Sequence, residues 1–154
     1  MNIRKVTKKD IEKVAKLQAQ FIHSHIKYNS ELYKPKKDFS NIWKKYAIKC
    51  LTNDDKLFIL VEDKEIIGYA IATVTSRAPV YKISKIGVID AITVDVNHQQ
   101  KGIASKLMEN CLKWFKEKEL TYIEAFVDSN NIGSLKLNTK FGLKEYQKRI
   151  FMKI

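Results

Sequence analysis

The sequence is poor in the residues that build cross-linked, repetitive or membrane-spanning proteins. Its 154 residues include only two cysteines, two prolines and five glycines. Two cysteines cannot form a disulfide framework, and neither belongs to a CxxC motif or to a Cys/His cluster that would suggest structural zinc. So little glycine and proline excludes collagen-like and low-complexity chains. No apolar run reaches the roughly 18 residues of a transmembrane helix, and the N-terminus lacks the apolar stretch of a signal peptide.

What remains is the composition of one globular domain. Apolar residues make up 45% of the chain and aromatic residues 10%, which excludes a compositionally disordered protein. A chain of about 150 residues is long enough to bury a sizeable core. We therefore expect a soluble, cytoplasmic protein in which residues 1–154 form a single domain.

The net charge of +12 is concentrated in the first third of the chain. Residues 1–50 carry 13 basic and 4 acidic side chains, whereas residues 51–100 carry 5 and 7. Such an excess can indicate nucleic acid, a membrane surface or a polyanionic ligand. The lysines are scattered singly, however, without interleaved arginines and aromatics, so we expect solvated helix faces. A nucleic-acid-binding module remains a rival hypothesis based on charge alone.

Hydrophobic periodicity predicts alternating helices and strands. Thr7 and Asp10 have the spacing of a capping box in front of the first amphipathic helix. A strand, helix, strand succession over 86–127 implies one parallel pair in an otherwise antiparallel sheet, and hence an α/β (α+β) fold. The expected elements are helices over 8–23, 39–50, 102–120 and 131–140, a hairpin over 57–74, strands over 86–94 and 121–127, and a closing strand pair over 143–153.

Residues 92–107 join a β-branched strand to an amphipathic helix through a polar turn. Gly102 and Ala104 at the helix entry let a ligand approach the backbone, and the unpaired amides of the first turn favour an anion. Lys101 and Lys106 add positive charge. The spacing of a Rossmann fingerprint and of a Walker A loop is absent.

Two motifs in this half of the chain resemble those of a known family. Gln99-x-x-Gly102-x-Ala104 resembles the Q/R-x-x-G-x-G/A signature of the GNAT superfamily of acyl-CoA-dependent N-acyltransferases. Asn131-x-x-Ser134-x-x-Leu137-Asn138-x-Lys140-x-Gly142-Leu143 resembles that family's second pattern, and one helix and one strand separate the two, as in the family. The resemblance implies a mixed, mostly antiparallel sheet flanked by helices, with acetyl-CoA as co-substrate and no metal.

The resemblance also implies where acetyl-CoA binds. The pantetheine arm would pair with main-chain groups near the end of the 86–94 strand, which a β-bulge splays from the 121–127 strand. The pyrophosphate would lie on the amides of the following turn, and Asn131 would hydrogen-bond the pantetheine. The cofactor-binding residues expected on this basis are Val94, Asp95, Val96, Gln99, Gln100, Lys101, Gly102, Ile103, Ala104, Ser105, Asn131 and Ser134.

Asp90 and Glu124 are the two candidates for the catalytic base. Asp90 lies in an apolar strand, where burial would raise its pKa into a useful range; alternatively, it is structural and pairs with the loop over 76–84. Glu124 is a base, a holder of water, or a surface charge. Asn138 matches the family's tyrosine, often the acid that protonates the leaving thiolate, and has no proton to give. Tyr122 and Tyr146 are possible replacements.

We expect no metal-binding or catalytic role for the histidines and cysteines. His23 and His25 are two residues apart on a helix and cannot share a face, which argues against a metal site. We expect His98 to be solvated in its turn. Cys111 has the apolar helical spacing of core packing, so an acyl-cysteine mechanism is not expected.

These observations predict an N-acetyltransferase that moves an acetyl group from acetyl-CoA directly to a primary amine of a small molecule or protein. The alternative from another class is a non-catalytic acyl-CoA-binding or sensing domain, which the asparagine at position 138 favours. Protein N-termini, lysines, polyamines, aminoglycosides and amino acids all remain open as acceptors. The basic N-terminal third favours neutral or acidic ones. We expect a monomer or homodimer, with no membrane or nucleic-acid partner.

Overall fold

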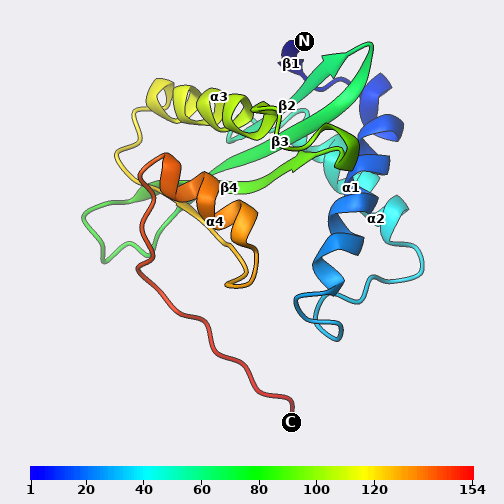
Figure 1. Ribbon diagram of the computed structural model, residues 1–154. Helices are drawn as coiled ribbons and strands as arrows, with labels where there is room; N and C mark the ends of the chain where they lie inside the picture. Colours follow the sequence, from blue (N-terminus) through cyan, green and yellow to red (C-terminus); the bar gives the residue numbers. More distant parts are fainter.

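The computed structural model describes residues 1–154 and contains one five-stranded sheet in the order β1-β2-β3-β4-β5 (Figure 1). Neighbouring strands are antiparallel from β1 to β4, and β5 is parallel to β4. The predicted mixed, mostly antiparallel sheet is thereby confirmed. The strands are β1 Asn2–Lys5, β2 Lys56–Asp63, β3 Glu65–Ser76, β4 Lys85–Val94 and β5 Ile123–Ala125.

Helices cover both faces of the sheet. One face, which includes Phe58 and Tyr69, packs against the first two helices, and the other, which includes Leu57 and Ile59, packs against the third. A strand buried on both faces needs an unbroken apolar run, and β2 has one at residues 57–61. The helices are α1 Ile11–Ile26, α2 Phe39–Cys50, α3 Ile103–Glu117 and α4 Ile132–Lys140, with 3₁₀ turns at Lys8–Asp10 and Val96–His98. None of them is both long and apolar enough to cross a membrane.

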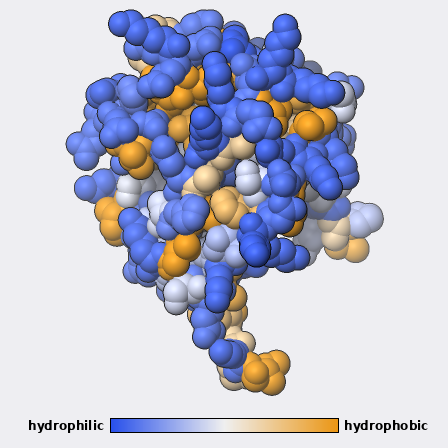
Figure 2. All heavy atoms as spheres, turned by 90° about the vertical axis from the view of Figure 1, so that its right-hand side faces the viewer, coloured by the Kyte–Doolittle hydropathy of each residue, from blue (hydrophilic) through white to orange (hydrophobic).

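The closing strand pair predicted over 143–153 is wrong. Residues 143–154 form neither helix nor strand and extend from the body as an irregular tail (Figure 1, red). The tail keeps side-chain contacts with the body, because Arg149 lies over the ring of Phe126 and Lys153 pairs with Glu31 at 3.1 Å. The strand on whose edge they would pair, β5, is only three residues long, so it offers few backbone groups for a further ladder. Ile150 is 95% exposed and Phe151 72%. Apolar side chains therefore gather on the protruding tail in Figure 2.

A bulge in β4 separates this strand from β5. Ala91 pairs with Ile71 and Ile89 with Ala72, which leaves Asp90 as an extra residue in β4. The parallel pairing with β5 ends at Ile89, yet β4 continues to Val94. The two strands thus part at Asp90, and the edge of β4 beyond it is open.

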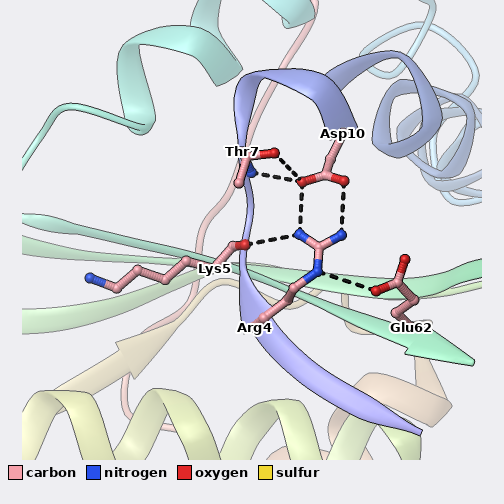
Figure 3. Close-up of polar contacts among 5 residues, drawn as sticks. All are labelled: Arg4, Lys5, Thr7, Asp10 and Glu62. Carbon is pink, nitrogen blue, oxygen red and sulfur yellow. Dashed lines mark hydrogen bonds and ion pairs between the residues drawn. The ribbon is translucent and has the colours of Figure 1, made fainter.

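A charged cluster ties the start of α1 to the first two strands (Figure 3). The guanidinium of Arg4 donates two hydrogen bonds to the carboxylate of Asp10, at 2.8 and 2.9 Å, and one to Glu62 at 3.2 Å. The backbone and hydroxyl of Thr7 donate to the same carboxylate, so the predicted capping box is present. These hydrogen bonds, led by that from Arg4, hold the pKa of Asp10 well below its usual range.

We expect Asp10→Asn to lower the free energy of unfolding by about 1–3 kcal/mol at pH 7, because it removes charge-assisted hydrogen bonds. A depressed carboxyl pKa stabilises the fold above the unfolded value of about 3.9, and that stabilisation is lost as the pH falls below it. The difference between wild type and variant in urea denaturation should therefore shrink between pH 6 and pH 3. The exposed Asp54→Asn variant is the control, and a difference that does not change with pH would contradict the expectation.

Candidate functional site

The open edge of β4 presents free main-chain groups. The amide of Asp95 donates to the carbonyl of Ile67 on the β3 side, at 2.9 Å. Successive residues of an antiparallel strand alternate in direction, so Val94 turns its N–H and C=O toward the opposite edge, which β5 has left. An extended ligand can add there in the manner of a strand. Val96 differs, because its amide already donates to Gln20 at 3.3 Å.

The carboxylate of Asp95 builds the turn that follows β4. It accepts hydrogen bonds from Gln20 at 3.0 Å, from the amide of Asn97 at 2.9 Å and from His98 at 3.1 Å. The bond from Gln20, followed by that from His98, lowers the pKa of Asp95. His98 is therefore held in the turn by Asp95, and its side chain is partly exposed, at 28%, rather than freely solvated. Gln20 also fixes α1 beside this turn.

The first turn of α3 is uncapped. Gly102 precedes the helix with a φ of 76° and has no side chain to cap it. The first hydrogen bond of the helix runs from the amide of Lys106 to the carbonyl of Gly102, at 3.1 Å. The amides of Ile103, Ala104 and Ser105 therefore have no acceptor within the helix. A Cβ added at Gly102 would meet nothing within 4 Å, so the turn faces open space. This geometry suits a phosphate group.

Lysine side chains surround that turn. Lys140 on α4 donates to the hydroxyl of Ser105 at 3.0 Å, and Lys101 donates to the carbonyl of Asn97 at 3.3 Å. Gln99 and Gln100 are exposed in the same turn. Lys140 was not among the expected site residues, although it belongs to the second motif. Its role depends on the contact between α3 and α4, which the motif alone does not describe.

Residues of the second motif form hydrogen bonds within α4. The side-chain oxygen of Asn131 accepts from the amide of Ser134 at 3.1 Å, which caps the helix and leaves the amide nitrogen of Asn131 for a ligand. Asn138 is buried, and its amide nitrogen donates to the carbonyl of Ser134 at 2.8 Å. Its side-chain oxygen is buried without a partner. An unpartnered amide oxygen can accept a hydrogen bond but cannot supply a proton.

Asp90 is not buried, contrary to expectation. Its side chain is 31% exposed, because the bulge places it where β5 departs. The argument from burial therefore fails for this residue. It accepts a hydrogen bond from Thr73, and the ammonium of Lys56 lies 3.9 Å away, so the alternative pairing with the loop over 76–84 is also wrong.

Glu124 is the central residue of β5, and its carboxylate accepts a hydrogen bond from the hydroxyl of Tyr146 at 2.7 Å. This bond raises the pKa of Tyr146. Tyr146 is 76% exposed and Tyr122 61%. Both tyrosines are therefore largely exposed to solvent, and neither is enclosed at the open edge of β4.

The remaining polar candidates serve the fold. His23 and His25 each hydrogen-bond through Nδ1 to a carbonyl one turn earlier, at 2.7 and 2.8 Å. Cys50 and Cys111 are buried, as expected for Cys111. Burial raises the pKa of Cys111 to about 12, which makes a nucleophilic thiolate unavailable at neutral pH.

A hollow of about 380 Å³ lies between the second half of α1, the connection to α2 and the segment that follows β5. Phe126 and Asp128 line it, two residues of the segment that continues β5 past the point where it leaves β4. Phe21, the neighbour of Gln20, also lines it. Gln20 and Phe21 thus link the end of β4 to the hollow through α1, and β4 leads into the uncapped turn of α3.

Comparison with known proteins shows the family of the chain. Residues 19–143 match the model of the Acetyltransferase (GNAT) family. No curated protein matches the chain. Among solved structures, a tetramutant of the BH1408 protein from Bacillus halodurans has a TM-score of 0.88 at 18% identity, with all of both chains covered.

Two other structures have acetyltransferase names. A predicted acetyltransferase from Clostridium acetobutylicum, solved with acetyl-CoA, has a TM-score of 0.78 at 20% identity, covering 99% of this chain and 95% of its own. An aminoglycoside 6'-N-acetyltransferase from Acinetobacter haemolyticus has a TM-score of 0.77 at 17% identity, covering 100% and 98%. At these identities the likeness concerns the fold. The chain belongs to the GNAT family of acetyltransferases.

Proposed function

We propose that residues 1–154 form one N-acetyltransferase domain, which moves an acetyl group from acetyl-CoA directly to a primary amine. The observation that carries the proposal is the opening where β4 and β5 part at Asp90. It has free main-chain groups on one strand, an anion-binding turn at one end and a hollow beside it. A thioester and an amine brought together there gain reactivity mainly through their proximity.

The same geometry supports the expected acetyl-CoA site. Val94 would pair with the pantetheine arm, and Asn131 would donate its free amide nitrogen to it. The main chain at Asp95 and Val96 is occupied by Ile67 and Gln20, so these two residues would shape the site. The pyrophosphate would rest on the amides of the α3 turn. The residues proposed around it are Gln99, Gln100, Lys101, Gly102, Ile103, Ala104, Ser105, Ser134 and, in addition to the expected set, Lys140.

The reaction needs the acceptor amine in its neutral form. For an alkylamine with a pKa near 10.4, deprotonation at pH 7 costs roughly 4–5 kcal/mol. Asp90 is proposed as the base, because its carboxylate is partly exposed at the point where the two strands part. Glu124 is the second choice, since its carboxylate is shared with Tyr146.

We expect Asn138→Ala to lower turnover by less than tenfold, because Asn138 donates to Ser134 and has no proton for the leaving thiolate. Steady-state release of the CoA thiol measures this effect. The control is Thr139→Ala, an exposed neighbour on the same helix. A loss of several hundredfold would show that Asn138 itself orients the thiolate or a proton-carrying water.

The second candidate function is a non-catalytic acyl-CoA sensor, which the missing tyrosine at position 138 favours. A thermal shift with CoA, followed by a thiol-release assay over a panel of amines, separates the two. Acetyl transfer predicts stabilisation by CoA and release of thiol that depends on an amine. Stabilisation without turnover on any amine would support the sensor instead.

A further inference from the structure

The hollow beside the opening has an apolar wall. Six of its ten lining residues are hydrophobic: Phe21, Ile22, Leu32, Tyr33, Phe39 and Phe126. A volume of about 380 Å³ lies within the usual range for small-molecule sites, which are mostly apolar with a few placed polar groups. The wall therefore suits an aromatic or branched apolar group better than a sugar.

The hollow lies next to the opening between β4 and β5, where the reaction is proposed to occur. Phe126 lies one residue beyond β5, on the part of the chain that has left β4. Phe21 follows Gln20, which hydrogen-bonds to Asp95 at the end of β4. The hollow is thus joined to both sides of the opening, so a molecule resting in it would lie near the proposed thioester site.

The charges of the hollow limit which amines can occupy it. Asp128 is its one acidic residue, and Lys34 is cationic. One oxygen of Asp128 accepts from the amide of Asn130 at 3.0 Å, which holds the half-buried carboxylate in place and leaves its other oxygen without a protein partner. A single carboxylate can pair with one ammonium group. It cannot neutralise the several ammonium groups of a polyamine or an aminoglycoside, which Lys34 and the net charge of +12 repel.

Building on the proposed function, we propose that the acceptor is a small primary amine carried on an aromatic or branched apolar body, with the body in the hollow. Asp128 would attract the ammonium form of the amine into the hollow, and the amine would react after passing its proton to Asp90. This assignment selects one class among the acceptors that the sequence leaves open. Burying an aromatic side group is worth about 1.5–3 kcal/mol, which corresponds to roughly 10- to 100-fold.

The test compares 2-phenylethylamine with ethylamine, spermidine and kanamycin as acceptors for the full chain, by release of the CoA thiol. We expect kcat/KM for 2-phenylethylamine to exceed that for ethylamine by about 10- to 100-fold. Spermidine and kanamycin should be poorer acceptors than 2-phenylethylamine. A protein that acetylates spermidine or kanamycin better would overturn the acceptor assignment and leave the acetyltransferase function standing.

Variants locate the effect. Phe126→Ser should lower kcat/KM for 2-phenylethylamine by tenfold or more and change that for ethylamine by less than twofold. Val80→Ser is the control, since Val80 is 85% exposed on the loop between β3 and β4 and does not line the hollow. An equal loss for both amines in Phe126→Ser would overturn the assignment. Binding of CoA with no turnover of any amine would overturn the proposed function and the assignment together.

Discussion

Gly102→Asp should weaken CoA binding about a thousandfold. The variant places a carboxylate on the uncapped turn of α3, where the pyrophosphate is proposed to lie. Two like charges about 4 Å apart near a protein surface repel by about 4 kcal/mol, equivalent to roughly three powers of ten in Kd. Isothermal titration calorimetry with CoA measures the loss.

Gly102→Asn is the matched control for this variant. Asparagine and aspartate both tolerate the left-handed φ of 76° found at Gly102, and an added Cβ there meets nothing within 4 Å. The two variants therefore share their backbone strain and differ in charge. Gly102→Asn should lose far less affinity at the same melting temperature. Unchanged CoA affinity in a folded Gly102→Asp protein would remove the cofactor site from this turn.

Asp90→Asn should lower turnover at pH 7 by about 10²–10⁴-fold, the usual range for the loss of a general base. The activity should partly return at pH 9–10, where more of an alkylamine with a pKa near 10.4 is already neutral. The fold should survive, since asparagine can still accept the hydrogen bond from Thr73. A pH–rate profile of wild type and variant with one amine tests both effects.

Glu124→Gln serves as the comparison, because it also neutralises a carboxylate near the opening. A structural Asp90 would instead lower the melting temperature on substitution and leave the shape of the pH profile unchanged. A stable Asp90→Asn enzyme with near-normal turnover at pH 7 would exclude it as the base. The base would then be Glu124 or solvent, and the loss in Glu124→Gln would decide between them.

Much of the fold can be predicted from local patterns in the sequence. The apolar runs on either side of residues 62–65 give the β2–β3 hairpin, and the periodicity of residues 103–115 gives α3. The closing strand pair could not be judged in this way, because a strand needs an edge to pair with. The apolar residues of 143–154 suggest strands, yet β5 is only three residues long.

The site likewise has one part that local sequence predicts and other parts that depend on the tertiary structure. The uncapped turn at Gly102, where the pyrophosphate is proposed to lie, could be predicted, because it depends on consecutive residues. The exposure of Asp90 could not, because the bulge is a property of how β4 pairs with β3. The hollow depends on residues of α1 and of the segment after β5, about a hundred positions apart, and no local pattern links them.

Transfer of a labelled acetyl group tests the central claim most directly. The protein is incubated with acetyl-CoA carrying ¹³C in its acetyl group and with each of 2-phenylethylamine, ethylamine, spermidine and kanamycin, and the products are analysed by mass spectrometry. We predict that the label appears in an amide of at least one amine, with one CoA thiol released for each amide formed and no label on the protein. Label that remains entirely in acetyl-CoA, in a protein that CoA stabilises, would contradict the proposed acetyltransferase.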